Sequence, residues 1–259
     1  MLRKLIVLAC LCAPAAWAQR PDPQAARQML DLVNAERERR GAPALAWDDK
    51  AAEAAMRHAE QMVKHADLSH QFSGEPSLRD RLSATGLKFN DDGENIAYDS
   101  AIEDAHDRLM ESPGHRANIL NPRFDAAGVA VIWKGVRVYV VENFVRRIPD
   151  LPDSETASRI VDAYNRARKA AGMRPVASKH DLRDAACDMA KKDHVSARNI
   201  GDLKARSVVA FTTFQPEELP QSLQSRVAEN YSRVSVGACF ARTPSYPSGT
   251  NWVVMVFYP

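Results

Sequence analysis

Apolar residues recur at helical spacing in three segments of the first half of the chain. The first segment spans about residues 23–40, and Gly41 ends it as a C-terminal cap. The second spans about residues 48–65 and has alanines and methionines on one face. The third spans about residues 101–111 and is ended by Pro113-Gly114. These segments predict three helices.

Two Val-rich runs after the third helix predict strands, at residues 128–133 and 137–144. Lys134-Gly135 lies between them and predicts a hairpin. Helices followed by an antiparallel hairpin are typical of an α+β layered domain, because alternating βαβ units would separate the strands by helices.

The second half of the chain repeats the pattern of the first. Residues 148–154 are rich in proline and polar residues and predict a linker. Four later segments match earlier ones: 160–168 match 30–37, 172–175 match 41–43, 222–227 match 77–82, and 228–230 match 93–95. An internal repeat explains these matches; the alternative is two unrelated helix-plus-strand domains. We therefore predict a complete domain at 25–147 and a smaller, degenerate copy at 155–259.

The first 18 residues have the organisation of a secretory signal peptide. Arg3 and Lys4 precede a short apolar run, and Ala16-Trp17-Ala18 offers the small residues that signal peptidase requires. The run is shorter than the roughly 20 residues needed to span a bilayer, so we expect an exported chain that is not transmembrane and is either periplasmic or secreted. The alternative is a lipoprotein, because Val7 to Cys10 loosely resembles a lipobox.

Charge and cysteine usage narrow the partners and the compartment. The chain carries 35 Lys and Arg against 33 Asp and Glu, so it becomes neutral by formal count when Arg3 and Lys4 are removed. Nucleic acid is therefore not an expected partner, because it would need a basic patch. Cys187 and Cys239 remain after the signal, and in an oxidising compartment they predict a disulfide rather than two buried thiols.

Five of the seven histidines lie in the first half, and several sit in distinctive strings. The strings are Asn34 to Arg37, His58 to Met62, Ser69-His70, Gly93 to Ala97, Ser112 to Leu120, Asn121 to Phe124 and Gly128 to Val131. Together they resemble the CAP superfamily, which includes cysteine-rich secretory proteins, antigen 5 and pathogenesis-related proteins, in its bacterial SCP-like form. The resemblance implies a three-layer α-β-α sandwich for residues 25–147.

The resemblance also implies a cavity lined by two histidines and two acids, which in several members binds a divalent cation. His70, His115 and Glu94 match three of these positions and would form a zinc site with an open position. The fourth acid is in doubt, because the register points to Ser112; we choose Glu111, with Asp107 as the alternative. A polar network that only ties loops together is the other interpretation of these residues.

The remaining histidines and the second copy receive structural interpretations. We expect His58 to be a hydrogen-bonded packing residue and His65 and His106 to be solvated on helix surfaces. Arg116 should pair with a carboxylate or cap a carbonyl. In the second copy, the position of His70 falls on Ala197, no counterpart of the third helix fits, and Glu229 would be a relic of Glu94.

These residues favour a binding protein without catalytic residues. Its first domain would hold a divalent cation, with a small or lipid ligand or an envelope protein as partner. The alternative is a metal- or carboxylate-dependent hydrolase, in which Glu94 or a zinc-bound water acts. Ser112 is a poor nucleophile candidate because the Gly-x-Ser-x-Gly elbow is absent and the residue should end a helix. A third hypothesis is a purely structural module that docks through residues 155–259.

Overall fold

The computed structural model of the protein describes residues 19–198, 200 and 204–259. The predicted signal peptide, with Cys10 of the lipobox alternative, lies outside the described residues. Among the helices that are described, none is long and apolar enough to cross a membrane. Internal contacts divide the chain into two compact units: the described part of 1–75 with 94–121 and 127–143, and 76–93 with 122–126 and 144–259. Each unit is made of three separate chain segments. The division therefore does not test the predicted linker at 148–154, which stays a prediction.

The first sheet has five strands, in the order β1-β4-β5-β3 with β2 paired to β4. The strands are β1 (Gln19–Pro21), β2 (Ala46–Trp47), β3 (Phe89–Asp99), β4 (Ala126–Lys134) and β5 (Arg137–Arg147). The predicted hairpin is confirmed as β4 and β5. Strand β3 was not expected; it contains Gly93 to Ala97, one of the strings that carry the family resemblance.

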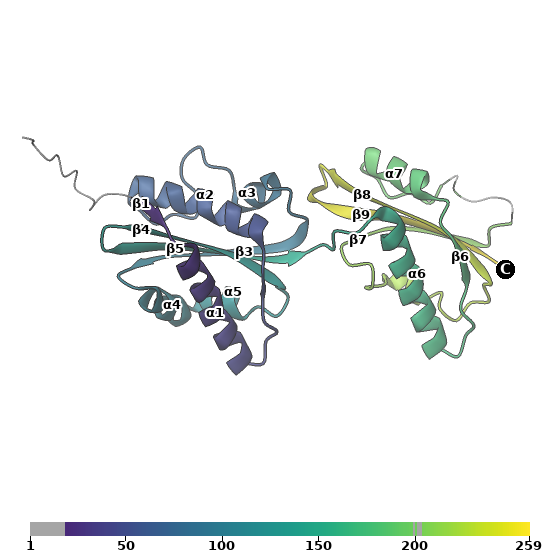
Figure 1. Cartoon of the computed structure of the whole chain (residues 1–259). Coiled ribbons are helices and arrows are strands. Elements are labelled where there is room, and N and C mark those ends of the chain that lie inside the picture. The colour runs from purple at the N-terminus through teal and green to yellow at the C-terminus, as the bar shows by residue number, and fades with distance from the viewer. Residues whose placement is uncertain (1–18, 199, 201–203) are drawn as a thin grey trace, which may run out of the picture. The chain divides into compact units, whose positions relative to one another are not determined.

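Five helices belong to this part of the chain: α1 (Pro23–Arg39), α2 (Asp49–His65), α3 (Leu78–Ala84), α4 (Ile102–Glu111) and α5 (Pro113–Leu120). Figure 1 shows α2 on one face of the sheet and α1, α4 and α5 on the other, which gives the three-layer α-β-α arrangement. The three predicted helices are confirmed as α1, α2 and α4. Helix α5 was missed: Pro113 stands at its N-terminus, where proline starts a helix as readily as it ends the previous one.

Helix α2 forms because its cap and its apolar face agree. The Asp48 side chain accepts a hydrogen bond from the backbone amide of Ala51 at 2.9 Å, which satisfies one of the amides left unpaired at a helix start. Its buried face packs on the sheet in one cluster, which includes Ala55, Ala59, Met62, Val63, Ile96, Ala130, Ile132, Tyr139 and Val141. This face carries His58 as well, so the same periodicity that buries the alanines buries an imidazole.

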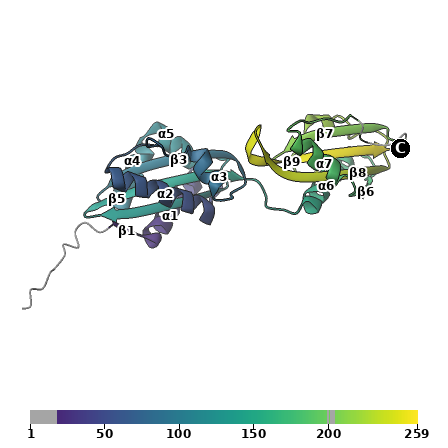
Figure 2. The same ribbon diagram turned by 90° about the horizontal axis from the view of Figure 1, so that it is seen from above.

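The second part of the chain is built on a four-stranded sheet in the order β6-β8-β9-β7, which Figure 2 shows side by side. Its elements are α6 (Asp153–Ala170), β6 (Ala177–Lys179), α7 (Arg183–Lys191), β7 (Ser207–Thr213), α8 (Gln221–Gln224), β8 (Arg233–Thr243) and β9 (Tyr246–Tyr258). Helix α6 takes up the last two residues of the predicted linker. The predicted disulfide is confirmed: Cys187 in α7 is bonded to Cys239 in β8.

Two asparagines make the same pair of hydrogen bonds in the two halves. Asn34 in α1 donates to the carbonyl of Leu45 at 3.0 Å and accepts from its amide at 2.7 Å. Asn165 in α6 donates to the carbonyl of Val176 at 3.2 Å and accepts from its amide at 2.9 Å. Both side chains therefore fix the chain segment that leads from the first helix of each half into a short strand.

A buried arginine in α1 holds three carbonyls together. Arg37 is fully buried, and it donates to the carbonyls of Pro43 at 2.6 Å, Ile119 at 2.8 Å and Asn121 at 2.9 Å. Its burial lowers its pKa, but the carbonyl partners compensate the charge with hydrogen bonds. Arg37 thus joins α1 to the end of α5.

Arg168 in α6 makes the corresponding set of bonds in the second half. It is 1% exposed and donates to the carbonyls of Arg174 at 2.7 Å, Val227 at 3.0 Å, Glu229 at 2.8 Å and Tyr231 at 3.2 Å. By these partners, Val227 and Glu229 occupy the places of Ile119 and Asn121.

If the two halves are related in this way, two of the expected sequence matches change. Residues 222–227 lie where α5 lies in the first half, and not where α3 lies. Residues 228–230 are outside any strand, so they do not correspond to Gly93-Glu94-Asn95 of β3. Glu229 is therefore no relic of Glu94; its carboxylate accepts a hydrogen bond from the Tyr231 hydroxyl at 2.7 Å.

Each half also has a glycine where a strand meets the start of a helix. A Cβ atom on Gly128 of β4 would lie 1.9 Å from the backbone nitrogen of Ala52, at the start of α2. A Cβ atom on Gly237 of β8 would lie 2.1 Å from the backbone of Leu182, just before α7. Only glycine allows this approach of helix to strand.

Candidate functional site

His70 and Glu94 form the centre of the predicted site. His70 lies in the loop after α2, and its Nδ1 is 2.9 Å from Oε1 of Glu94 in β3. The two side chains differ in exposure, with 57% of the His70 side chain exposed and 3% of the Glu94 side chain. A buried carboxylate thus holds one nitrogen of an imidazole whose ring reaches solvent.

The loop that carries His70 has a defined backbone. Ala66 ends α2 in the left-handed conformation with φ 52°, and the amide of Asp67 donates to the carbonyl of Met62 at 3.2 Å. Ser69 then accepts from the amide of Gln71 at 3.3 Å and donates to its carbonyl at 2.8 Å. These bonds fix the turn on both sides of His70.

His115 stands in the first turns of α5, with its ring centroid 6.5 Å from that of His70. Partial burial lowers the pKa of His115, and the neighbouring His70 lowers it further. Both causes favour the neutral imidazole, which is the form that binds a metal.

Two asparagines fix α5 against β3. Nδ2 of Asn95 donates to the carbonyl of His115 at 3.2 Å, and Nδ2 of Asn118 donates to the carbonyl of Glu94 at 3.2 Å and to Oδ1 of Asn95 at 3.0 Å. The backbones that carry His115 and Glu94 are therefore tied to each other through side-chain amides.

A buried acid lies beneath this network and was not predicted. Glu142 in β5 is fully buried, and Oε2 accepts a hydrogen bond from Asn95 at 3.0 Å. Burial raises the pKa of Glu142 to about 7, against the lowering effect of the Asn95 hydrogen bond. The sequence hid this residue because it stands within the Val-rich run that predicted a strand.

His58 and Glu75 add a second imidazole–carboxylate pair behind the first. Nδ1 of His58 is 2.7 Å from Oε1 of Glu75. Nε2 of His58 is 3.9 Å from Oε1 of Glu94 and is buried without a hydrogen-bond partner. The predicted packing role of His58 agrees with its burial. Glu75 carried no signal in the sequence.

Comparison with known proteins identifies this part of the chain. A profile of the cysteine-rich secretory protein family, CAP, matches residues 30–144. Residues 30–144 are a CAP domain. The family resemblance drawn from the histidine-containing strings is thereby confirmed.

Three similar proteins share this domain. YlbC, an uncharacterized membrane protein of Bacillus subtilis, is 37% identical over 126 residues, which are 47% of this chain and 34% of YlbC. The uncharacterized YkwD of the same organism is 32% identical over 110 residues, 42% of this chain and 43% of YkwD. The structure of an extracellular SCP-domain protein from Bacillus anthracis is 35% identical, with a TM-score of 0.45, over 48% of this chain and 40% of that one. The chain therefore spans less than half the length of these relatives.

The CAP domain does not bring every predicted ligand together. Glu111 is the exposed last residue of α4, and Asp107 is also exposed. In the part of the chain that the structure describes, one group alone places three potential ligand atoms within 4.8 Å of one another: Asp153 with the disulfide-bonded Cys187 and Cys239. His70 therefore lies near both Glu94 and His115, but the three residues do not form a closed three-ligand cluster.

Other predicted residues in the CAP domain have definite places. Ser112 ends α4 as expected, and Arg116 caps the carbonyl of Met110 at 2.8 Å. His65 is exposed and stacks on Phe72, with ring centroids 4.5 Å apart.

The expectation of a solvated His106 was wrong: it is 4% exposed, neither ring nitrogen has a hydrogen-bond partner, and burial lowers its pKa. Helical spacing from Ile102 could have predicted this.

The second half has different residues at the corresponding positions. Asp193 has φ 48° after α7, as Ala66 does after α2, and Ser196 accepts from the amide of Arg198 at 3.2 Å, as Ser69 does from Gln71. This turn places Ala197 where the CAP domain has His70. Strand β7, SVVAFTT, which lies beside β9 as β3 lies beside β5, contains no acidic residue.

Proposed function

We propose that the chain is an exported CAP-domain binding protein whose first domain holds a divalent cation through His70 and His115. The observation that carries the proposal is the pairing of an exposed His70 with the buried Glu94, next to a second imidazole at a ring separation of 6.5 Å. Two imidazoles are a common ligand pair for zinc and its neighbours among the transition metals.

The donor set fits a cation with Glu94 in a supporting role. Because Nδ1 of His70 is held by Glu94, Nε2 is the nitrogen that would bind the metal. A carboxylate on the other nitrogen is the usual partner of a metal-binding histidine, since it fixes the tautomer and the ring orientation. We therefore assign His70 and His115 as ligands and Glu94 as the residue that orients His70. Water would complete the coordination, which makes the cation readily exchangeable.

The chemistry that such a cation supplies is Lewis acidity at an open coordination position. We propose that this position takes a polar group of a small ligand or of an envelope component, lipid or protein. Export follows from the signal-like residues 1–18, and we propose the periplasm or the cell exterior as the compartment. The hydrolase alternative would use the same coordination position for a metal-bound water, which would be the nucleophile.

We further propose that residues 155–259 are a degenerate copy of the CAP domain. The similar hydrogen-bond sets of Asn34 and Asn165 and of Arg37 and Arg168 support this, as does the strand order, because β2-β4-β5-β3 in the first sheet matches β6-β8-β9-β7 in the second. The copy would have kept the framework of the fold while losing the cation site.

The experiment is a zinc measurement on residues 19–259, with His70→Ala, His115→Ala and Glu94→Gln variants. We expect one zinc per chain at saturation, loss of binding in both histidine variants, and roughly 10- to 100-fold weaker binding in Glu94→Gln, because a supporting carboxylate has about that effect. His180→Ala is the matched control, since His180 is exposed and lies in the second half.

Two results would contradict the proposal. Zinc that binds equally well to the His70→Ala variant would place the metal elsewhere. A wild-type chain that takes up no zinc from solution would leave the histidines with the structural role of tying the loop after α2 to β3.

A further inference from the structure

The turn that carries His70 in the CAP domain has a cationic counterpart in the second half. The segment after α7 keeps the turn but changes its side chains: Ala197 replaces His70, and Arg198 replaces Gln71. Counted from the same turn, His194 replaces Asp67, and Lys192 replaces His65. The replacements remove the cation ligand and add positive charge.

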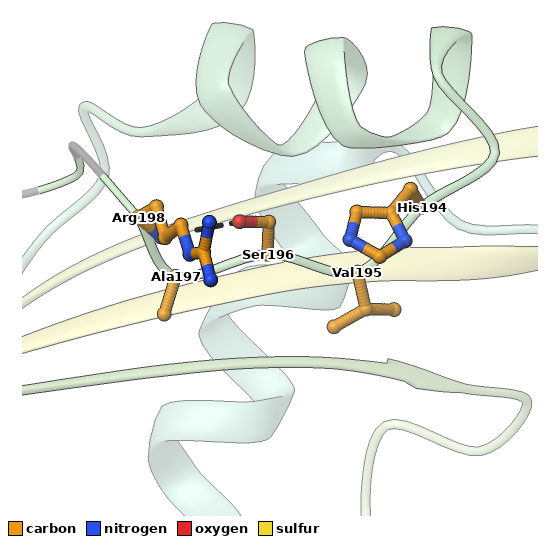
Figure 3. A pocket seen from close by; sticks show the side chains of 5 residues that line it. All are labelled: His194, Val195, Ser196, Ala197 and Arg198. Atoms are coloured by element: carbon orange, nitrogen blue, oxygen red, sulfur yellow. Dashed lines mark hydrogen bonds between the residues drawn. The ribbon is translucent and has the colours of Figure 1, made fainter.

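Two adjoining hollows share the side chains of this segment. One, of about 630 Å³, is lined by residues 194–198. The other, of about 410 Å³, extends to α7 and is lined by Ala185, Asp188, Met189, Lys192, His194, Ser196, Arg198 and Ile200. Figure 3 shows His194, Ser196 and Arg198 along one side of the segment, with Val195 and Ala197 pointing the other way.

We propose that the hollow extending to α7 is a binding site for a small oxyanion, a carboxylate or a phosphate group. Lys192 and Arg198 supply fixed positive charge, His194 adds a third nitrogen donor group, and the Ser196 hydroxyl lies between His194 and Arg198. The one acid in the lining, Asp188, forms an ion pair with Lys191 at 3.0 Å. A guanidinium and an ammonium on the same hollow match the donor requirements of an oxyanion.

The side chains of Lys192 and His194 are not needed to cap the last carbonyls of α7. Lysines often follow a helix because they offset the negative charge of its last carbonyls. Here backbone amides already occupy these carbonyls: Lys192 donates to Asp188 at 3.3 Å, Asp193 to Ala190 at 3.0 Å and His194 to Met189 at 3.1 Å. Backbone amides, and not the side chains of Lys192 and His194, therefore cap these carbonyls.

The base of the segment is also anchored, so the hollow has a fixed edge. Asp193 accepts from the Thr243 hydroxyl at 2.6 Å and from the amide of Ser245 at 2.9 Å. The Cys187–Cys239 disulfide joins α7 to β8. Counted back from the same turn, Ala185 of α7 corresponds to His58 of α2. The smaller side chain leaves room where Ala185, Met189 and Ile200 line the hollow.

The test is an NMR titration of ¹⁵N-labelled residues 19–259 with inorganic phosphate and with acetate, at constant ionic strength set by sodium chloride. We expect saturable shifts of the amides of residues 192–198, with a midpoint on the order of 10 mM or below. Arg198→Gln, which introduces the residue of the CAP domain, and Lys192→Gln should each weaken binding at least several-fold. The control is Lys169→Gln, an exposed lysine at the end of α6.

Saturation by phosphate alone, by acetate alone or by both supports the proposal and identifies the group that the site prefers. Shifts that stay linear in concentration, or an Arg198→Gln variant that binds like the wild type, would overturn it. The amides of α6 report in the same spectra whether each variant is folded. Because no metal is added, the result is independent of the cation site proposed for the CAP domain.

Discussion

The two halves of the chain share several buried polar contacts and differ in the residues of the candidate site. The CAP domain and residues 155–259 each use one buried arginine to gather carbonyls and one asparagine to hold the following segment. Each half ends its second helix with a left-handed residue, Ala66 or Asp193. Yet the CAP domain has His70, Glu94 and His115, and the second half has none of them at corresponding positions.

The comparison separates what the fold requires from what a site requires. An unpaired buried carbonyl or charge destabilises a fold, so a copy that loses Arg168 would lose its structure as well. A half-exposed histidine such as His70 contributes less to stability, because 57% of its side chain is exposed and its contact with a buried group is the hydrogen bond to Glu94. The binding proposed for the CAP domain would explain why these histidines are not needed at the corresponding positions of the second half.

The largest effect should follow from removing the buried arginines. Arg37→Ala and Arg168→Ala would each leave at least three carbonyls without a donor, and we expect each to destabilise its own half by roughly 3 to 5 kcal/mol. Urea unfolding, followed through NMR signals assigned to each half, measures the two separately. Arg166→Ala, at an exposed position of α6, should stay within about 0.5 kcal/mol. If one variant lowered the free energy of unfolding of both halves equally, each arginine would not act on its own half alone.

Glu142 gives the CAP domain a pH dependence that can be removed. Its pKa is raised from 4.5 to about 7 in the folded state, so the folded chain keeps a proton that the unfolded chain releases. Stability should therefore fall as the pH rises from about 4.5 to 7, by about 3 kcal/mol in total. Glu142→Gln keeps an acceptor for Asn95 and should remove this slope.

The measurement is urea unfolding of the CAP domain at pH 5, 6, 7 and 8, with and without Glu142→Gln. The signals of the second half serve as the internal control, since Glu142 lies outside it. A wild-type slope that persists unchanged in Glu142→Gln would assign the pH dependence to another group.

Sequence patterns predicted the elements whose surfaces are amphipathic and missed those defined by contacts. Helices α1, α2 and α4 followed from periodicity, and the disulfide followed from the count of cysteines and the compartment. Strand β3 was missed because its first half, FNDDGEN, is polar. Of the site residues, His70, Glu94 and His115 were found through the family strings. Glu75 and the buried state of Glu142 depend on which segments pack together, and no local pattern contains that information.

The two close-approach glycines should show a smaller and symmetric effect. Gly128→Ala and Gly237→Ala would each force a helix start away from its strand, because the new Cβ would lie about 2 Å from backbone atoms. We expect each to cost about 1 to 3 kcal/mol in its own half, the usual range for overpacking. Gly114→Ala is the control: it has open space around it and lies in α5, where alanine is favoured over glycine by about 1 kcal/mol. If Gly237→Ala were as stable as the wild type while Gly128→Ala was destabilised, α7 could shift away from its strand and α2 could not.

The smallest change in stability, and the sharpest test of the comparison, comes from exchanging His70 and Ala197. Both positions are exposed and lie in the same serine-stabilised turn. Ala197→His should alter stability by less than about 0.5 kcal/mol, and His70→Ala by about 1 kcal/mol, because it removes the hydrogen bond to Glu94. Zinc binding should be lost in His70→Ala and should not be gained by the double variant, because β7 has no acid to orient the new imidazole. Zinc uptake by the double variant would mean that one imidazole on this turn is sufficient, and that Glu94 and His115 are dispensable.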